Sequence, residues 1–200
     1  VGNGVRFSNN LSNFHKFIKK LNIPVCTVWN SHDILTNDSS LYAGRPGADG
    51  ERAGNFNMQN SDLLIIVGAR MHVRQIGFDH TSFAREAKRV MIDIDKAEIE
   101  KPNLRIDYKI NMDLGAFFNL FSQYDKNIIS KNTHHAKFLN WCKINVKELK
   151  VIEDRHLDPK KGVINPYNFV SSLFKNMPKN ANVITGDGTA AVVTFKAAVL

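Results

Sequence analysis

Cysteine is scarce in this sequence. Cys26 and Cys142 are its two cysteines among 200 residues, and they lie far apart with no spacing typical of metal ligands. Small secreted folds held by disulfides contain many more cysteines, so the sequence favours a reduced, cytoplasmic protein. Cys26 lies in an apolar run, and we expect it to be a small core residue rather than a nucleophile.

Long apolar runs and a secretory signal pattern are also lacking. No uninterrupted apolar stretch approaches the roughly 20 residues that a membrane-spanning helix requires, so we expect no contact with a membrane. The first residue is valine, from which we expect the chain to begin inside a longer protein.

Positive charge is present, but it is unevenly distributed. The net charge is +8. Residues 1–125 carry fifteen Lys and Arg against fourteen Asp and Glu, whereas residues 126–162 carry nine against four. Aromatic residues do not alternate with the basic ones as they do in nucleic-acid grooves. We therefore expect a solvated basic linker over residues 126–162 and no nucleic-acid partner.

The first part of the chain alternates between strand-like and helix-like patterns. Apolar runs predict strands at residues 23–29, 62–68, 89–95 and 105–110, and residues 1–5 resemble the tail of another strand. Helical spacing predicts helices at residues 11–21, 50–60, 81–87 and 112–121. Apolar strands separated by helices are typical of a parallel sheet that is covered on both faces. Residues 1–125 are therefore predicted to form a Rossmann-like α/β domain.

The rest of the chain predicts a linker and the start of a second α/β domain. The linker contains an amphipathic helix with the stripe Phe138, Cys142, Asn145 and Leu149. Residues 163–200 begin with a helix, for which Asn165 is the predicted cap and Pro166 the first residue. A strand at residues 182–185 and a helix at residues 188–200 are predicted to follow.

Several glycine-rich segments could approach a nucleotide. "VGNGVR" places Gly2, Gly4 and Arg6 at a predicted strand end, although no third glycine completes a dinucleotide fingerprint and a simple turn is an equally good interpretation. In "AGRPGADGERAGN", Gly47 and Gly50 could offer N–H groups to an anion, and the neighbouring arginines, Arg45 and Arg52, could pair with phosphate. The alternative for this second segment is a surface turn.

Two further segments follow predicted strands. "VGARMHVRQIGFD" contains Gly68, Arg70 and Arg74, which suit a diphosphate at the carboxyl end of a strand. "VMIDID" ends with Asp93 and Ile94, where a carboxylate can bind a ribose. Asp93 and Asp95 have no third carboxylate beside them, so no metal ligand is predicted. No Ser/His/Asp or Cys/His set stands in a persuasive context, and no catalytic residue is predicted.

Taken in order, these segments resemble the central domain of thiamine-diphosphate-dependent enzymes, and most of all the acetolactate synthase branch. The resemblance runs to about residue 120. It resumes at "INPYNFVSSLFKNMPKNANVITGDGT", which looks like the start of the family's diphosphate-binding domain. It implies a homodimeric or homotetrameric enzyme that uses thiamine diphosphate and Mg²⁺ to decarboxylate a 2-keto acid such as pyruvate and transfer the acyl carbanion. It also implies FAD or an adenine nucleotide in the central domain of several members.

The motif Gly186-Asp187-Gly188 allows two interpretations. It could be the family's metal motif, or a turn that holds the cofactor diphosphate. Its position at the first strand–helix turn of the second domain, after the predicted strand at residues 182–185, favours the turn. The resemblance then implies diphosphate contacts at Gly188, Thr189 and Ala190, with Asp187 not binding Mg²⁺.

Two other hypotheses remain open at this stage. The α/β domain could be a nucleotide- or flavin-binding module without catalysis, or a purely structural domain with an empty crevice. Fold alone does not decide among them.

Overall fold

The computed structural model describes residues 1–124, 134–158 and 162–200. Its sheet consists of three parallel strands in the order β1 (Leu63–Val67), β2 (Lys88–Asp93) and β3 (Tyr108–Asn111). Leu63 pairs with Lys88 at the start of the first ladder, and Val90 pairs with Tyr108 in the second. Parallel neighbours joined by long crossovers are the expected product of the alternating pattern, and the predicted Rossmann-like α/β class is confirmed.

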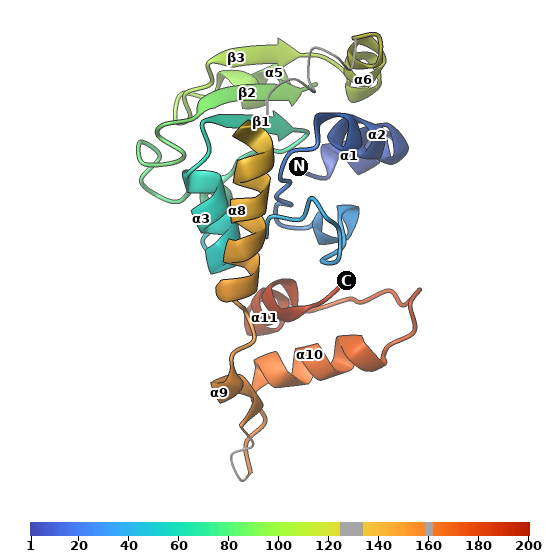
Figure 1. Ribbon diagram of the computed structural model, residues 1–200, viewed down its shortest axis with the longest axis vertical. Helices are drawn as coiled ribbons and strands as arrows, with labels where there is room; N and C mark the ends of the chain where they lie inside the picture. The colour runs from blue at the N-terminus through green and yellow to red at the C-terminus, as the bar shows by residue number, and fades with distance from the viewer. Residues whose placement is uncertain (125–133, 159–161) are drawn as a thin grey trace.

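Helices surround this sheet and continue beyond it. In Figure 1, α8 extends from beside β1 towards the part of the molecule that contains α9, α10 and α11. The helices and their bounds are α1 (Gly4–Phe7), α2 (Leu11–Leu21), the 3₁₀ helix η1 (His32–Ile34), α3 (Arg52–Gln59), α4 (Val73–Ile76), α5 (Lys96–Glu100), α6 (Leu114–Ser122), α8 (His134–Glu148), α9 (Asp154–Leu157), α10 (Pro166–Asn176) and α11 (Thr189–Ala197).

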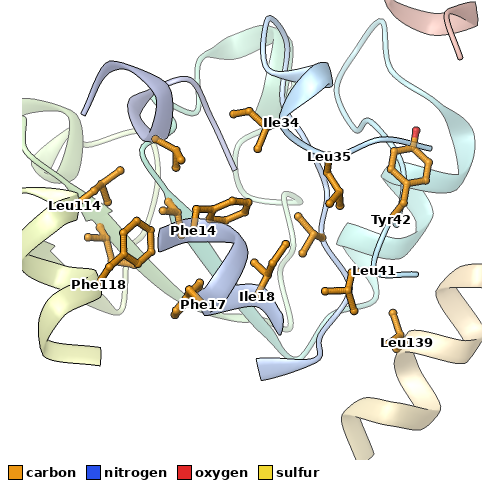
Figure 2. Packing of buried hydrophobic residues seen from close by; sticks show 14 residues of the cluster. Phe14, Phe17, Ile18, Ile34, Leu35, Leu41, Tyr42, Leu114, Phe118 and Leu139 are labelled. Atoms are coloured by element: carbon orange, nitrogen blue, oxygen red, sulfur yellow. The ribbon is translucent and has the colours of Figure 1, made fainter. Parts of the chain in front are cut away.

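The sheet separates two hydrophobic cores. Side chains alternate between the faces of a strand, so Val67 and Ile92 enter one core while Ile66 and Met91 enter the other. Figure 2 shows the first core, where aromatic rings of α2 meet residues of α6 and where Leu139 of α8 approaches. Burial on both faces at its carboxyl end explains why β1 is apolar throughout.

The strand predicted at residues 23–29 is reduced to an isolated bridge between Val25 and Tyr42. Val1 lies beside this segment: the amino terminus donates to the Cys26 carbonyl at 2.8 Å, and the Val28 N–H donates to the Val1 carbonyl. The Gly2 N–H donates to Val67 of β1. Extended backbone therefore continues past β1, but the pairing is too short and irregular to form a regular ladder. Gly4–Phe7 then forms α1 instead of further strand.

The helix predicted at residues 81–87 is wrong, because this segment forms turns. Ala84 has a φ of +39° and its N–H donates to the side chain of Gln59, which is incompatible with a continuous helix. Phe83, Ala84 and Ala87 are all buried in the second core. Tertiary burial has overridden the local helical pattern here.

The predictions after residue 134 are partly confirmed. α8 buries Leu139 and Cys142, and α10 begins as expected, since the Asn165 side chain accepts from the Tyr167 N–H at 2.9 Å. The strand predicted at residues 182–185 is absent, and Ile184 is 95% exposed. A parallel strand needs a neighbour for its N–H and C=O groups, and none of the described segments pairs with it. The part of the basic linker at residues 126–133 and 159–161 lies outside the described residues.

Candidate functional site

The carboxyl ends of β1 and β2 bring two of the predicted segments together. Gly68 directly follows β1 and Asp93 ends β2. The Gly68 N–H donates to the Ile92 carbonyl at 3.0 Å, which joins the two strand ends. In open α/β sheets this edge is the usual place for a ligand, so we treat it as the first candidate site.

Gly2, Gly4 and Gly68 form a close contact between two backbone segments. The Gly4 N–H donates to the Gly68 carbonyl at 3.0 Å. A β-carbon on Gly2 would lie 2.4 Å from the Gly68 oxygen, and one on Gly4 would lie 2.7 Å from the Gly68 α-carbon. The missing β-carbons therefore allow one backbone segment to lie against the other. The N–H groups of all three glycines already have protein partners.

The loop that contains Gly47 and Gly50 lies against α4. The Ala48 N–H donates to the Arg74 carbonyl at 2.6 Å, so this loop contacts the helix that follows β1 in the chain. The Gly47 N–H donates to the side chain of Asn55 at 2.8 Å, and the Gly50 N–H donates to the Gly47 carbonyl at 3.0 Å. Internal bonds thus occupy the N–H groups that were predicted to bind an anion.

The exposed cations at this edge are paired with carboxylates. Arg70 Nε lies 2.8 Å from Glu98 and Arg74 lies 2.6 Å from Asp49, yet the arginine side chains are 78% and 62% exposed. Burial acts to raise the pKa of Glu98, but hydrogen bonds from Lys101 and Arg70 outweigh it and lower this pKa. Exposed guanidinium groups in such surface pairs can exchange a carboxylate for a phosphate at little cost.

The remaining predicted residues of this region also lie at the surface. One carboxylate oxygen of Asp93 accepts from the Asp95 N–H at 3.0 Å, and Ile94 is 71% exposed. Arg6 pairs with Asp33 at 2.8 Å. Partial burial and the positive charge of Arg70 lower the pKa of the intervening His72, which favours a neutral imidazole.

The second candidate site is the turn that precedes α11. Gly188 has a φ of +81°, and an added β-carbon would meet no atom within 4 Å. The first N–H groups of a helix have no partner inside it, and no side chain caps this one. Asp187 Oδ1 accepts from the Gly188 N–H at 2.8 Å. Thr189 and Ala190 begin the helix beside this open space, so the turn fits a phosphate oxygen.

A buried polar cluster connects α11 to the loop before α3. Arg45 is 2% exposed. Its Nη1 donates to the carbonyls of Phe195 at 3.0 Å and Ala198 at 2.8 Å, and its Nη2 donates to Asn37 at 2.9 Å. The prediction that Arg45 pairs with phosphate is therefore replaced by a role at the carboxyl end of α11. Sequence reasoning missed this role because the partners lie about 150 residues away.

Burial shifts the pKa values of the groups around Arg45. The carboxylate of Glu51 accepts from the Tyr42 hydroxyl at 2.8 Å, and burial raises the pKa values of both side chains. Burial also lowers the pKa of His32 to about 3, with Arg45 adding to the effect. His32 contacts the rings of Trp29 and Phe195. This cluster is a structural contact between the first part of the chain and α11.

The described residues contain neither a metal-binding cluster nor a membrane-spanning helix. Among residues 1–124, 134–158 and 162–200, no group of three or more His, Cys, Asp and Glu side chains could hold a metal ion. Within the same ranges, no helix has both the length and the apolar character needed to cross a bilayer.

Comparison with known proteins shows which family of proteins this chain resembles. Residues 1–120 match the model of the thiamine pyrophosphate enzyme central domain. The chain is 32% identical over 197 residues to a probable acetolactate synthase large subunit of Methanococcus aeolicus, an alignment that covers 94% of this chain and 32% of the relative. It is 31% identical over 175 residues to the corresponding protein of Methanocaldococcus jannaschii, covering 88% of this chain and 28% of the relative.

A bacterial relative agrees over a shorter stretch. Isozyme 2 of the acetolactate synthase large subunit of Escherichia coli is 32% identical over 128 residues, which cover 62% of this chain and 23% of that protein. The chain thus spans about a third or less of the length of these relatives.

Proposed function

The chain belongs to the thiamine-pyrophosphate-dependent enzymes and matches their central domain, and from this premise we propose that it is part of an acetolactate-synthase-like enzyme. The whole protein would decarboxylate a 2-keto acid such as pyruvate and transfer the resulting acyl group. The observation that carries this proposal is the alignment with the Methanococcus aeolicus protein, which continues past the central domain over 94% of the chain.

Within this proposal, the chain divides into three parts. Residues 1–125 form the central domain, residues 126–162 the basic linker, and residues 163–200 the start of the diphosphate-binding domain. The separate hydrophobic cluster of Val170, Val193, Ala197 and Ala198 supports the last boundary. Leu139 of the linker helix instead packs into the first core, so the linker is anchored to the central domain.

Thiamine diphosphate, when bound, would supply the electron sink for decarboxylation, and Mg²⁺ would join its diphosphate to the protein. The residues that would hold the diphosphate are Gly188, Thr189 and Ala190, where Thr189 and Ala190 would offer N–H groups and Gly188, whose N–H is bonded to Asp187, would leave room for the ligand. Their support is the open space beside Gly188 and the uncapped start of α11. Because backbone N–H groups and the helix dipole both favour an anion there, this turn would orient the phosphates without a charged side chain.

The edge of the sheet would bind FAD or an adenine nucleotide. The exposed heads of Arg70 and Arg74 suit a diphosphate, and the free oxygen of Asp93 suits a ribose. Gly2, Gly4, Gly68, Gly47 and Gly50 would support this ligand by bringing the segments together, since their N–H groups are already bonded. An absorbance spectrum of the purified protein and mass spectrometry of released ligand would separate flavin, adenine nucleotide and an empty crevice.

We further propose that the full enzyme is a cytoplasmic homodimer or homotetramer and that the 200-residue chain alone is inactive. The function is tested with the intact protein, pyruvate, thiamine diphosphate and Mg²⁺. We expect acetolactate to form and its formation to stop when either cofactor is omitted. Release of carbon dioxide with no acetolactate would indicate a simple decarboxylase, and no consumption of any 2-keto acid would contradict the proposal.

A further inference from the structure

Two adjoining hollows lie where the segment after α8 meets α11. They enclose about 300 Å³ and about 240 Å³, and the first is of the size of small-molecule sites. Both are lined by Leu149, Lys150, Val151 and Lys196. Because both hollows are lined by these four residues, they lie next to each other.

The first hollow is lined by cations from separate parts of the chain. Arg52 comes from α3, Lys150 from the segment after α8, Arg155 from α9 and Lys196 from α11. Glu153 is the one carboxylate among the described residues that line it. Glu153 lies 2.7 Å from Arg155 and 4.0 Å from Arg52. Four cations against one carboxylate leave a local excess of positive charge.

A histidine adds a hydrogen-bond donor to this lining. The His156 ring stacks on the Tyr167 ring, with centroids 4.9 Å apart and an interplanar angle of 14°. Its Nδ1 accepts from the Glu153 N–H at 3.0 Å. A ring nitrogen that accepts carries no proton, so the proton lies on Nε2, which can donate to a ligand.

The second hollow has a different character. Beyond the shared wall its lining is mainly aliphatic: Ala53, Val146, Ile152, Ala197, Ala198 and Val199. Tyr42 and Glu51 also line it, but they bond to each other. A ligand that filled both hollows would therefore carry an anionic group at one end and an apolar or flat group at the other.

From this arrangement we propose that the two hollows bind a small phosphate-bearing ligand of the nucleoside monophosphate type. Its phosphate would lie among Lys150, Arg155, Lys196 and the Nε2–H of His156. These donors come from different segments, and the several oxygens of a phosphate can accept hydrogen bonds from all of them. A single carboxylate could accept from only some of them. The base would occupy the aliphatic hollow.

This site is separate from both sites described above. Lys196 lies in the last turn of α11, roughly 12 Å along the helix from Gly188 at a rise of about 1.5 Å per residue. Arg70 and Arg74 are not among its lining residues. A ligand here would connect α3, the segment after α8 and α11, and so would stabilise the contact between the central domain and the following unit.

The test is calorimetric titration of the intact protein with inorganic phosphate and with adenosine monophosphate at constant ionic strength. Lys150→Gln is compared with Lys175→Gln, which removes the same charge from an exposed position on α10 outside the hollows. We expect saturable binding, an affinity about tenfold weaker in Lys150→Gln, and no change in Lys175→Gln, since a lost charged hydrogen bond is worth about one decade. Equal unfolding temperatures without ligand would show that both variants fold.

Each alternative outcome contradicts a defined part of the proposal. No saturable binding of either probe, or equal weakening in the two lysine variants, would overturn it. Equal affinities for phosphate and adenosine monophosphate would show that the aliphatic hollow does not contribute to binding. An affinity that falls in Arg70→Gln but not in Lys150→Gln would place the ligand at the sheet edge instead, which would support the proposed function and overturn this inference.

Discussion

At the scale of single residues, the buried charges have the largest consequences. Arg45 and Glu51 have side chains that are 2% and 6% exposed, and Arg45 Nε lies 3.7 Å from the Glu51 carboxylate. Removing one member of a buried pair leaves the other as an uncompensated charge, which costs more than the pair itself contributes. These residues are therefore more sensitive to substitution than the exposed arginines of the sheet edge.

We predict that Arg45→Met lowers the free energy of unfolding by about 3 kcal/mol or more. The substitution leaves the buried Glu51 carboxylate without its cationic partner, and it removes the donor to the two carbonyls at the end of α11. Urea unfolding followed by circular dichroism measures the change. Arg52→Met is the matched control, since its side chain is 71% exposed and its nearest carboxylate lies 4.0 Å away. Equal effects of the two substitutions would refute the role assigned to Arg45.

His32 predicts a specific dependence of stability on pH. Burial lowers its pKa from the ordinary value of 6.5 to about 3. Between these values the unfolded chain binds a proton that the folded chain does not, so stability falls as pH decreases below 6.5. The slope approaches about 1.4 kcal/mol per pH unit.

The test compares the free energy of unfolding of the natural chain with that of His32→Gln from pH 7 to pH 5. Above pH 5 few exposed carboxylates titrate, so the difference between the curves reports His32. We expect the slope in this range to be smaller in the variant. Parallel curves would show that His32 is not the group responsible.

At the scale of elements, backbone contacts decide where segments can meet. Gly2 and Gly4, the first residue of α1, lie directly against Gly68, which follows β1. This contact requires residues without a β-carbon on both sides, whereas a β-carbon on Gly186 would meet no atom within 4 Å. The same substitution, glycine to alanine, can therefore be compared at a crowded position and at an open one.

Gly2→Ala is predicted to destabilise the fold by several kcal/mol, because its β-carbon would lie 2.4 Å from backbone that cannot move freely. Gly186→Ala is the control, since an added β-carbon there meets nothing within 4 Å. Thermal unfolding of both variants provides the comparison. A melting temperature of Gly2→Ala equal to that of the control would mean that the two segments can separate.

The turn before α11 allows a prediction about cofactor binding in the intact enzyme. Gly188→Ala is expected to weaken thiamine diphosphate binding by about tenfold or more, because φ is +81° and a side chain there strains the turn. Asp187→Ala is expected to leave the Mg²⁺ requirement nearly unchanged, since its carboxylate accepts the neighbouring N–H instead. Cofactor and Mg²⁺ titrations of both variants test this. The reverse pattern would identify residues 186–188 as the metal motif.

At the scale of the whole molecule, segments that are far apart in the sequence contact each other. The chain nevertheless spans only 32% of the length of its Methanococcus aeolicus relative. We predict that the purified 200-residue chain does not convert pyruvate in the presence of thiamine diphosphate and Mg²⁺. No catalytic residue is predicted within these 200 residues, so the active site would need residues from the rest of the enzyme. Production of acetolactate or acetaldehyde that depends on the cofactor would disprove this prediction, and an intact homologous enzyme serves as the positive control for the assay.

The sequence by itself determined the class of fold and the family. Continuous apolar runs such as Leu63–Val67 are typical of strands that are buried on both faces, and helical spacing at residues 11–21 is typical of a helix with one buried face. Asn165 and Pro166 defined the start of α10 for local reasons, since a side-chain acceptor and a fixed φ act within one turn. Such signals need no knowledge of distant neighbours.

Tertiary structure alone decided the features that depend on distant partners. It turned residues 81–87 away from a helix by burying Phe83 and Ala84 together, and it left residues 182–185 without a strand because no described segment pairs with them. It placed the Arg45 side chain against the carboxyl end of α11, and it brought Lys150 and Lys196 to the lining of one hollow. Burial, hydrogen-bond partners and local charge arise from packing between segments that are far apart in the chain, so spacing along the sequence cannot specify them.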